Sequence, residues 1–321
     1  MKQPYPIEIQ APDISAWEHS NTGVPYVWSF DSGRPGPHVM VQALTHGNEF
    51  CGAIAVDWFL RQQIKPNAGR LTIAFANTLA YSRWDPENPS ASRYVDEDFN
   101  RVWGDDVLFG SRDSAELRRA RVLQPFVDAA DYLLDIHSMS EPCAPIMVCG
   151  ATGQGGEKSA ALSKRVGLPE FLLIDTGHPA GLRMIERGGF GKPDDPRTGL
   201  LIECGQHWEK SAADVANDTL LRFLHLFNMV DDAFVQPALR LPLCEKQRIV
   251  RVTEAVVAKS TGFRFNKDYK GLEVVPKKGD IVATDGDETI RVPYDNTVLV
   301  MPSTSNVKVG STTVRFGQFE D

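Results

Sequence analysis

A histidine and a glutamate three residues apart are the first residues whose types and spacing could do chemistry. His46 and Glu49 lie in the segment Leu-Thr-His-Gly-Asn-Glu at residues 44–49. An imidazole nitrogen and a carboxylate oxygen are both ligands of zinc in proteins. Gly47 lies between them and gives the backbone the freedom to bring both side chains to one point. A His-x-x-Glu pair is common by chance, so it predicts a metal site only if a third ligand is found.

A third ligand and an acid–base group follow two other apolar runs. Residues 132–136 are typical of a buried strand ending at His137, and residues 199–202 of a strand ending at Glu203. Two histidines and one carboxylate leave a fourth position for water, which is typical of catalytic zinc. Zinc would lower the pKa of that water and polarise a bound carbonyl. Glu203, a second carboxylate, would then take the proton of the water and pass it to a leaving amine.

Three other histidines do not combine with a carboxylate at a strand end in this way. We interpret His178 and His207 as loop or pocket-rim residues and as rival metal ligands, and His225 as a packing residue in a helix.

The elements that must position these residues are strands alternating with helices. The expected strands of the main body are residues 6–9 and 24–29 at the edge, and then 38–44, 71–76, 132–136, 170–174 and 199–202; the expected helices are 50–63, 114–130, 159–166 and 212–234. In open α/β sheets the chemistry lies at the carboxyl ends of the strands. Two long polar loops, 77–110 and 176–198, are expected to be functional because loops of this length are unusual in compact domains.

The pattern changes near residue 240. Beyond Pro242 the sequence predicts only short strands, at residues 248–257, 279–284, 289–293, 297–301 and 312–316. We therefore predict two domains, a catalytic domain at 1–240 and a small all-β domain at 241–321 that acts as a lid or an assembly surface.

The composition and net charge of the chain exclude several classes of protein. The chain has 321 residues, with 42% hydrophobic and 24% charged residues, as in ordinary globular proteins. The net charge is −8, with the acidic surplus in residues 1–240, so nucleic acid is not an expected partner. No apolar run is long enough to span a membrane, and residues 1–6 hold no apolar signal core. Five scattered cysteines without a Cys-x-x-Cys pair favour reduced thiols and a cytoplasmic location.

Four segments in order carry a family resemblance: Thr45–Glu49, Asp96–Arg101, Asp135–His137 and Ile202–Gly205. Together they resemble the succinylglutamate desuccinylase/aspartoacylase family of zinc carboxypeptidase-like metallohydrolases. The resemblance implies an α/β fold with a mixed sheet flanked by helices, followed by a small all-β domain. It also implies one zinc per chain, with His46, Glu49 and His137 as its ligands and Glu203 as the general base.

The resemblance extends to the residues that would bind substrate. It implies that Arg93 helps to polarise the scissile carbonyl and that Asn100 and Arg101 hold the α-carboxylate of the substrate. A guanidinium group matches a carboxylate in a bidentate way, which lysine does not. A weaker match places Arg187, nine residues after His178, on an acidic side chain of the substrate. The family also places a tyrosine of the C-terminal domain on the substrate, and no tyrosine follows Met301 here.

These observations predict a zinc-dependent amidohydrolase that removes an acyl group from a small N-acyl amino acid. One alternative is a metallocarboxypeptidase that cleaves peptides on the same fold. The other is a metal-free binding protein that has kept the fold. The acyl group, the amino acid and the existence of a homo-oligomer are left open.

Overall fold

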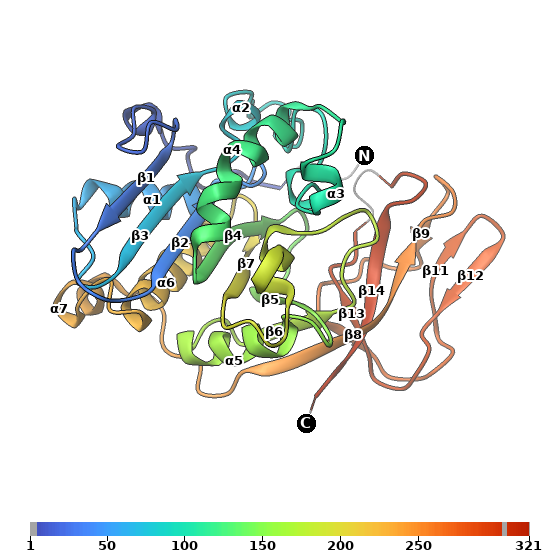
Figure 1. The fold of residues 1–321 in the computed structure, drawn as a ribbon. Helices are drawn as coiled ribbons and strands as arrows, with labels where there is room; N and C mark the ends of the chain where they lie inside the picture. The colour runs from blue at the N-terminus through green and yellow to red at the C-terminus, as the bar shows by residue number, and fades with distance from the viewer. Residues whose placement is uncertain (1–4, 304–306, 321) are drawn as a thin grey trace.

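One continuous sheet runs through the molecule, and helices cover both of its faces over the part built by the first 240 residues (Figure 1). The computed structural model describes residues 5–303 and 307–320. The sheet has eleven strands in the order β1 (Val27–Asp31), β3 (Arg70–Phe75), β2 (His38–Ala43), β4 (Tyr132–Met139), β7 (Thr198–Gln206), β5 (Ile146–Ala151), β6 (Phe171–Asp175), β8 (Arg248–Val257), β14 (Thr312–Phe319), β13 (Thr297–Val300) and β10 (Glu273–Val275).

The centre of the sheet is parallel and buried on both faces. Strands β3, β2, β4 and β7 run parallel, while β1 pairs antiparallel with β3 at the edge and β5 antiparallel with β7. Nearly every residue of β2, β4 and β7 is buried, as expected for parallel strands that are covered on both sides. The carboxyl ends of these three neighbouring strands therefore meet at one edge.

The helices form two layers. Helices α1 (Cys51–Arg61), α5 (Gly156–Val166) and α6 (Lys210–Leu226) pack on one face, and α4 (Ala115–Ala129) packs on the other. The remaining helical segments are short: α2 (Thr78–Tyr81), α3 (Asp105–Leu108), α7 (Asp232–Val235), and the 3₁₀ turns Ser15–Trp17, Phe99–Arg101, Met184–Glu186, Gly188–Gly191 and Gln236–Ala238. Each main layer buries an apolar stripe against the sheet, which is the arrangement expected of an α/β fold.

The C-terminal strands extend the same sheet rather than forming a detached one. Strand β8 pairs parallel with β6 and antiparallel with β14, so the ladder crosses residue 240 without a break. A second, three-stranded sheet packs against this extension, in the order β12 (Glu288–Arg291), β11 (Ile281–Asp285) and β9 (Arg264–Phe265). A division into two domains at residue 240 remains a prediction.

Several sequence-based expectations for single elements were wrong. Residues 6–9 form no strand, and residues 24–29 give only the later edge strand β1. The helix expected at 212–234 ends at Leu226, because Asn228 takes a left-handed φ of 54° and the chain turns before α7. Strand β5 was not expected, since its glycine-rich end has the composition of a loop.

Among the described residues no helix has the length and apolarity needed to cross a bilayer. Residues 1–4, which belong to the segment without an apolar signal core, lie outside the described residues.

Candidate active site

The turn after β2 is built under local strain. Leu44 is buried and has a φ of 60°, a left-handed conformation that costs a non-glycine residue about 1–3 kcal/mol. We expected Gly47 to provide backbone freedom, but its φ is not positive. Glycine is needed at this position because there is no space for a side chain. A Cβ on Gly47 would lie 2.4 Å from the carbonyl oxygen of Ser92 and 2.5 Å from the amide of Tyr81. The turn is therefore pressed against the loop at 77–93.

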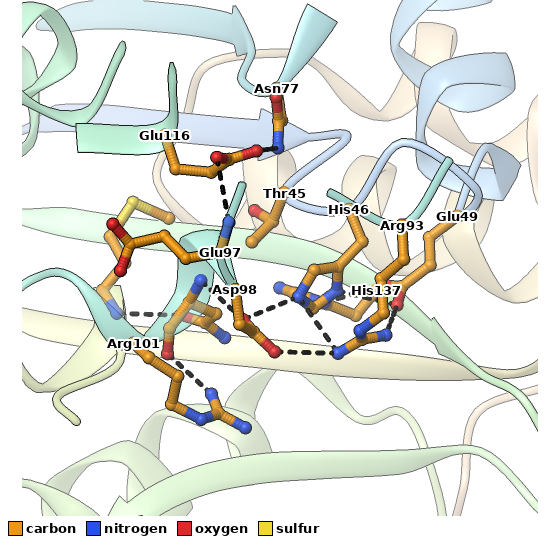
Figure 2. Close-up of polar contacts among 12 residues, drawn as sticks. Thr45, His46, Glu49, Asn77, Arg93, Glu97, Asp98, Arg101, Glu116 and His137 are labelled. Carbon is orange, nitrogen blue, oxygen red and sulfur yellow. Dashed lines mark hydrogen bonds and ion pairs between the residues drawn. The ribbon is translucent and has the colours of Figure 1, made fainter. Parts of the chain in front are cut away.

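His46, Glu49 and His137 come together in a buried cluster. Their ligand atoms all lie within 4.8 Å of one another. The Glu49 carboxylate faces both rings, with Oε1 at 2.8 Å from His46 Nδ1 and Oε2 at 2.9 Å from His137 Nδ1 (Figure 2). Within the described residues this is the one group of three or more such side chains that could hold a metal ion. These are the three ligands that the sequence predicts.

The outer nitrogens of both rings also face carboxylates. His46 Nε2 lies 3.0 Å from Asp98 Oδ1, and His137 Nε2 lies 2.8 Å from Asp135 Oδ2. Thr45 donates its hydroxyl proton to Asp135 and so fixes that carboxylate in turn. Metal-binding histidines typically have such a carboxylate partner, which orients the ring and leaves the other nitrogen to the metal.

The charges in this cluster favour a cation. Burial raises the pKa of Glu49, but the nearby imidazoles outweigh it and hold that pKa well below its usual range. Burial lowers the pKa of His137, yet Asp135 and Glu49 raise it well above its usual range. Three carboxylates around two imidazoles stabilise positive charge at the point where the ligand atoms converge. The donor set therefore fits a divalent metal ion.

Glu203 lies beside the cluster without belonging to it. It pairs in register with His137 across the parallel strands β4 and β7, so the two side chains project from the same face of the sheet. Both residues lie inside their strands, which run on to Met139 and Gln206, and not at the strand ends where we expected them. The buried Oε2 of Glu203 has no hydrogen-bond partner among the described residues. Burial raises the pKa of Glu203 to about 7.

Arg93 reaches the cluster from the long loop. Its Nη1 donates to Glu49 Oε1 at 3.0 Å, and its Nη2 lies 3.1 Å from His46 Nε2 and 3.3 Å from Asp98 Oδ2 (Figure 2). The guanidinium thus lies beside the His46–Glu49–His137 cluster and is partly exposed.

No pattern in the sequence indicated which residue holds this loop in place. The buried Glu116 of α4 accepts hydrogen bonds from the backbone amides of Val95, Asp96 and Glu97, and from the side chain of Asn77. Figure 2 shows the contacts with Asn77 and Glu97. A carboxylate near the first turn of a helix also interacts favourably with the helix dipole. Glu116 therefore positions the segment that carries Arg93 and Asp98.

Asn100 and Arg101 follow in the same segment. Asn100 is buried, and its Oδ1 accepts a hydrogen bond from the amide of Met184. Arg101 Nη1 donates to the carbonyl of Asn100, and no carboxylate within the described residues forms an ion pair with Arg101. Burial, followed by the positive charges of Arg93 and Arg183, lowers the pKa of Arg101 to about 10 against the opposing effect of Asp98. An arginine that is withdrawn from water and has no ion-pair partner among the described residues is suited to binding an anionic ligand.

Arg187 is engaged elsewhere. Its Nε and Nη2 donate to the carboxylate of Asp128, and its Nη1 donates to Asp105 and to the carbonyl of Trp103. None of these partners is a candidate site residue. A contact of Arg187 with the substrate remains a prediction, and it would require some of these bonds to be given up.

The other histidines lie outside the metal cluster. His207 is buried and its Nδ1 lies 2.9 Å from the hydroxyl of Ser138, while His178 lines a cleft in the loop at 176–182. His225 lies 3.3 Å from Asp232 near the end of α6.

Comparison with known proteins gives matches of two kinds. A family model described as the succinylglutamate desuccinylase/aspartoacylase catalytic domain matches residues 35–226. A probable aspartoacylase from Parasynechococcus marenigrum (strain WH8102) is 33% identical over 177 residues, which are 52% of this chain and 50% of that protein. The match thus spans about half the length of this curated relative.

Solved structures resemble nearly the whole chain. A succinylglutamate desuccinylase from Vibrio parahaemolyticus has a TM-score of 0.67 at 17% identity, covering 92% of this chain and 86% of that one. An aspartoacylase family protein from Mesorhizobium loti has a TM-score of 0.62 at 18% identity, covering 92% and 89%. At these identities the likeness concerns the fold, and it confirms the predicted fold class.

Proposed function

Because the chain belongs to the succinylglutamate desuccinylase/aspartoacylase family, we propose that it is a zinc-dependent amidohydrolase that removes the acyl group from an N-acyl amino acid. The observation that carries this proposal is the pairing of His137 with Glu203 on adjacent strands. It supports the proposal because His137, a proposed metal ligand, and the carboxylate of Glu203 lie side by side, as hydrolysis by an activated water requires.

His46, Glu49 and His137 would hold the zinc, since their donor atoms converge and their outer partners are in place. When bound, zinc supplies a Lewis acid that polarises the amide carbonyl and makes a water more acidic.

The residues of the chain supply the remaining steps. Glu203 accepts a proton from the attacking water through Oε2, which has no hydrogen-bond partner among the described residues, and delivers that proton to the departing amine. Arg93 stabilises the negative charge that develops on the carbonyl oxygen. Asn100 and Arg101 hold the α-carboxylate, so that the amide bond is presented to Glu203 in one orientation.

A substrate panel tests the proposed function. The zinc-loaded protein should hydrolyse at least one member of a set of N-acetyl, N-succinyl and N-formyl amino acids, with release of the free amine measured over time. The panel should include a blocked dipeptide with a free C-terminus, as a probe for carboxypeptidase activity. Cleavage of the dipeptide alone would favour the metallocarboxypeptidase, and no cleavage of any compound would contradict both activities.

Removing one ligand should remove the metal. We expect wild-type protein to contain one zinc per chain and His137→Ala to lose most of it, because two ligands cannot retain the ion against a chelating buffer. Elemental analysis after dialysis measures both, with His225→Ala as the control that should keep its zinc. Full zinc content in His137→Ala would identify His178 or His207 as the true ligand.

A further inference from the structure

The end of β7 is bulged beside the active site. After the Glu203 pair the parallel register of β4 and β7 shifts by one position, so that Met139 lies opposite Gln206 and β7 contains one residue more than β4. Gly205 lies in the bulge with a φ of 121°, a conformation that favours glycine. Bulges redirect the side chains near them and are frequent next to active sites. His207 comes directly after this bulged end of β7.

His207 contacts the strand that carries the proposed metal ligand His137. Its backbone amide donates to the carbonyl of Met139 at 2.9 Å, and its Nδ1 is hydrogen-bonded to the hydroxyl of Ser138 at 2.9 Å. The backbone amide of Ser138 in turn donates to Glu49 Oε2 at 3.2 Å. Ser138 thus contacts the side chain of His207 with one group and the Glu49 carboxylate with another.

Trp208 contacts the residue that precedes Glu49. Its Nε1 donates to the carbonyl of Asn48 at 3.2 Å, and its backbone amide donates to the side chain of Gln206 at 2.9 Å. The two residues after β7 are both buried. They therefore hold the metal-binding turn at two points, Asn48 directly and Glu49 through Ser138.

The imidazole of His207 has no part in the proposed hydrolysis, and its burial has a cost. The residue is 2% exposed, and its Nε2 forms no hydrogen bond within the described residues. Burial lowers the pKa of His207 to about 4 against the opposing charge of Glu49, so the ring is neutral at physiological pH. A buried polar ring with an unpaired nitrogen is less favourable than an apolar side chain in the same space. The contact with Ser138 is the feature that distinguishes this imidazole from an apolar filler.

We propose that His207 is a positioning residue for the metal site: it fixes Ser138, and the Ser138 amide holds the Glu49 carboxylate in the orientation that binds the ion. This proposal rests on the metal-binding part of the proposed function. His207 acts on the ion through Ser138 and Glu49 and is not itself a ligand. Residues that orient metal ligands typically account for about ten- to a hundredfold in metal affinity.

Two variants of similar shape test the proposal. Asparagine places an amide group where Nδ1 of the imidazole lies, whereas leucine has the same branching without polar atoms. The zinc dissociation constant, measured by competition with a chelator, should rise about ten- to a hundredfold in His207→Leu and less than about threefold in His207→Asn. Ser138→Ala should show a rise like that of His207→Leu, and the double variant should show no further rise because both changes break one contact. His225→Leu, at a histidine near the end of α6, is the control and should keep the wild-type value.

Two further measurements separate positioning from a general loss of structure. The Tm of the metal-free double variant Ser138→Ala/His207→Leu should equal or exceed that of the metal-free wild type, because both partners of a buried contact have been replaced by apolar groups. The visible absorption spectrum of the Co²⁺-loaded protein reports the arrangement of the ligands around the ion. This spectrum should change in His207→Leu and return to that of the wild type in His207→Asn.

Each outcome decides the role of His207. Equal zinc affinity in His207→Leu and the wild type would overturn the proposal. Similar losses in His207→Leu and His207→Asn would also overturn it, because they would show that the imidazole itself is required, as in a metal ligand. If the wild type binds zinc but hydrolyses no N-acyl amino acid, the proposed activity fails while these comparisons still decide the role of His207. A wild type that binds no zinc would contradict both.

Discussion

Glu203→Gln should keep its zinc and its fold but lose about a thousandfold in kcat, because an amide cannot accept the proton of the attacking water. The surroundings of Glu203 explain why the fold should be kept. Oε2 of Glu203 has no partner among the described residues, so no hydrogen-bond network within them is broken by the substitution. Burial favours the neutral form of this carboxyl, so a neutral glutamine should not lower the Tm. Glu209→Gln, in the turn before α6, is the control that should leave kcat unchanged. Near-normal activity of Glu203→Gln would mean that another group is the base.

The pH dependence of kcat/KM should follow the ionisation of Glu203. A base must be ionised to accept a proton, and the pKa of Glu203 is raised to about 7 by burial. The kcat/KM of the wild type should therefore rise as the pH increases through about 7, with a slope of one on logarithmic axes. The residual activity of Glu203→Gln should lack this rise.

Arg101→Ala should reduce kcat/KM on N-acyl amino acids by about a hundredfold, since the α-carboxylate loses a buried charge-assisted contact. The same variant should lose little on the matching α-amide, which presents a neutral group instead of the carboxylate. No carboxylate of the described chain pairs with Arg101, so its removal leaves no described acidic partner exposed. Arg83→Ala, at an exposed arginine of the same loop, is the control. Equal losses on acid and amide would indicate a structural role for Arg101.

The convergence of His46, Glu49 and His137 could be predicted from sequence because the strand ends of a parallel sheet must meet. His46 follows β2 and His137 lies near the end of β4, so the pairing of these two strands is enough to bring them together. The pattern of apolar residues identified both strands, and the position of Glu203 followed in the same way. Arg93 lies in a loop without periodicity, and the family resemblance alone indicated it.

Residues that depend on tertiary contacts could not be predicted. Glu116 has an ordinary position at the start of an amphipathic helix, and only the folded loop reveals the three amides that it binds. His207 follows a bulge in β7 that the alternation of residues does not indicate, so its contact could not be predicted from the sequence. Arg187 matched a spacing, whereas its contacts depend on Asp128 in α4.

The continuity of the sheet limits how the active site can open. Enzyme domains that close over a substrate usually move about a hinge of a few unpaired residues. Here β8 is hydrogen-bonded to β6 at residues 248–251 and to β14 at residues 250–257, so the two ladders overlap on one strand. A rotation of the C-terminal strands would have to break these bonds together. The C-terminal strands are therefore fixed to the rest of the sheet, and we expect them not to swing away from it as a separate body.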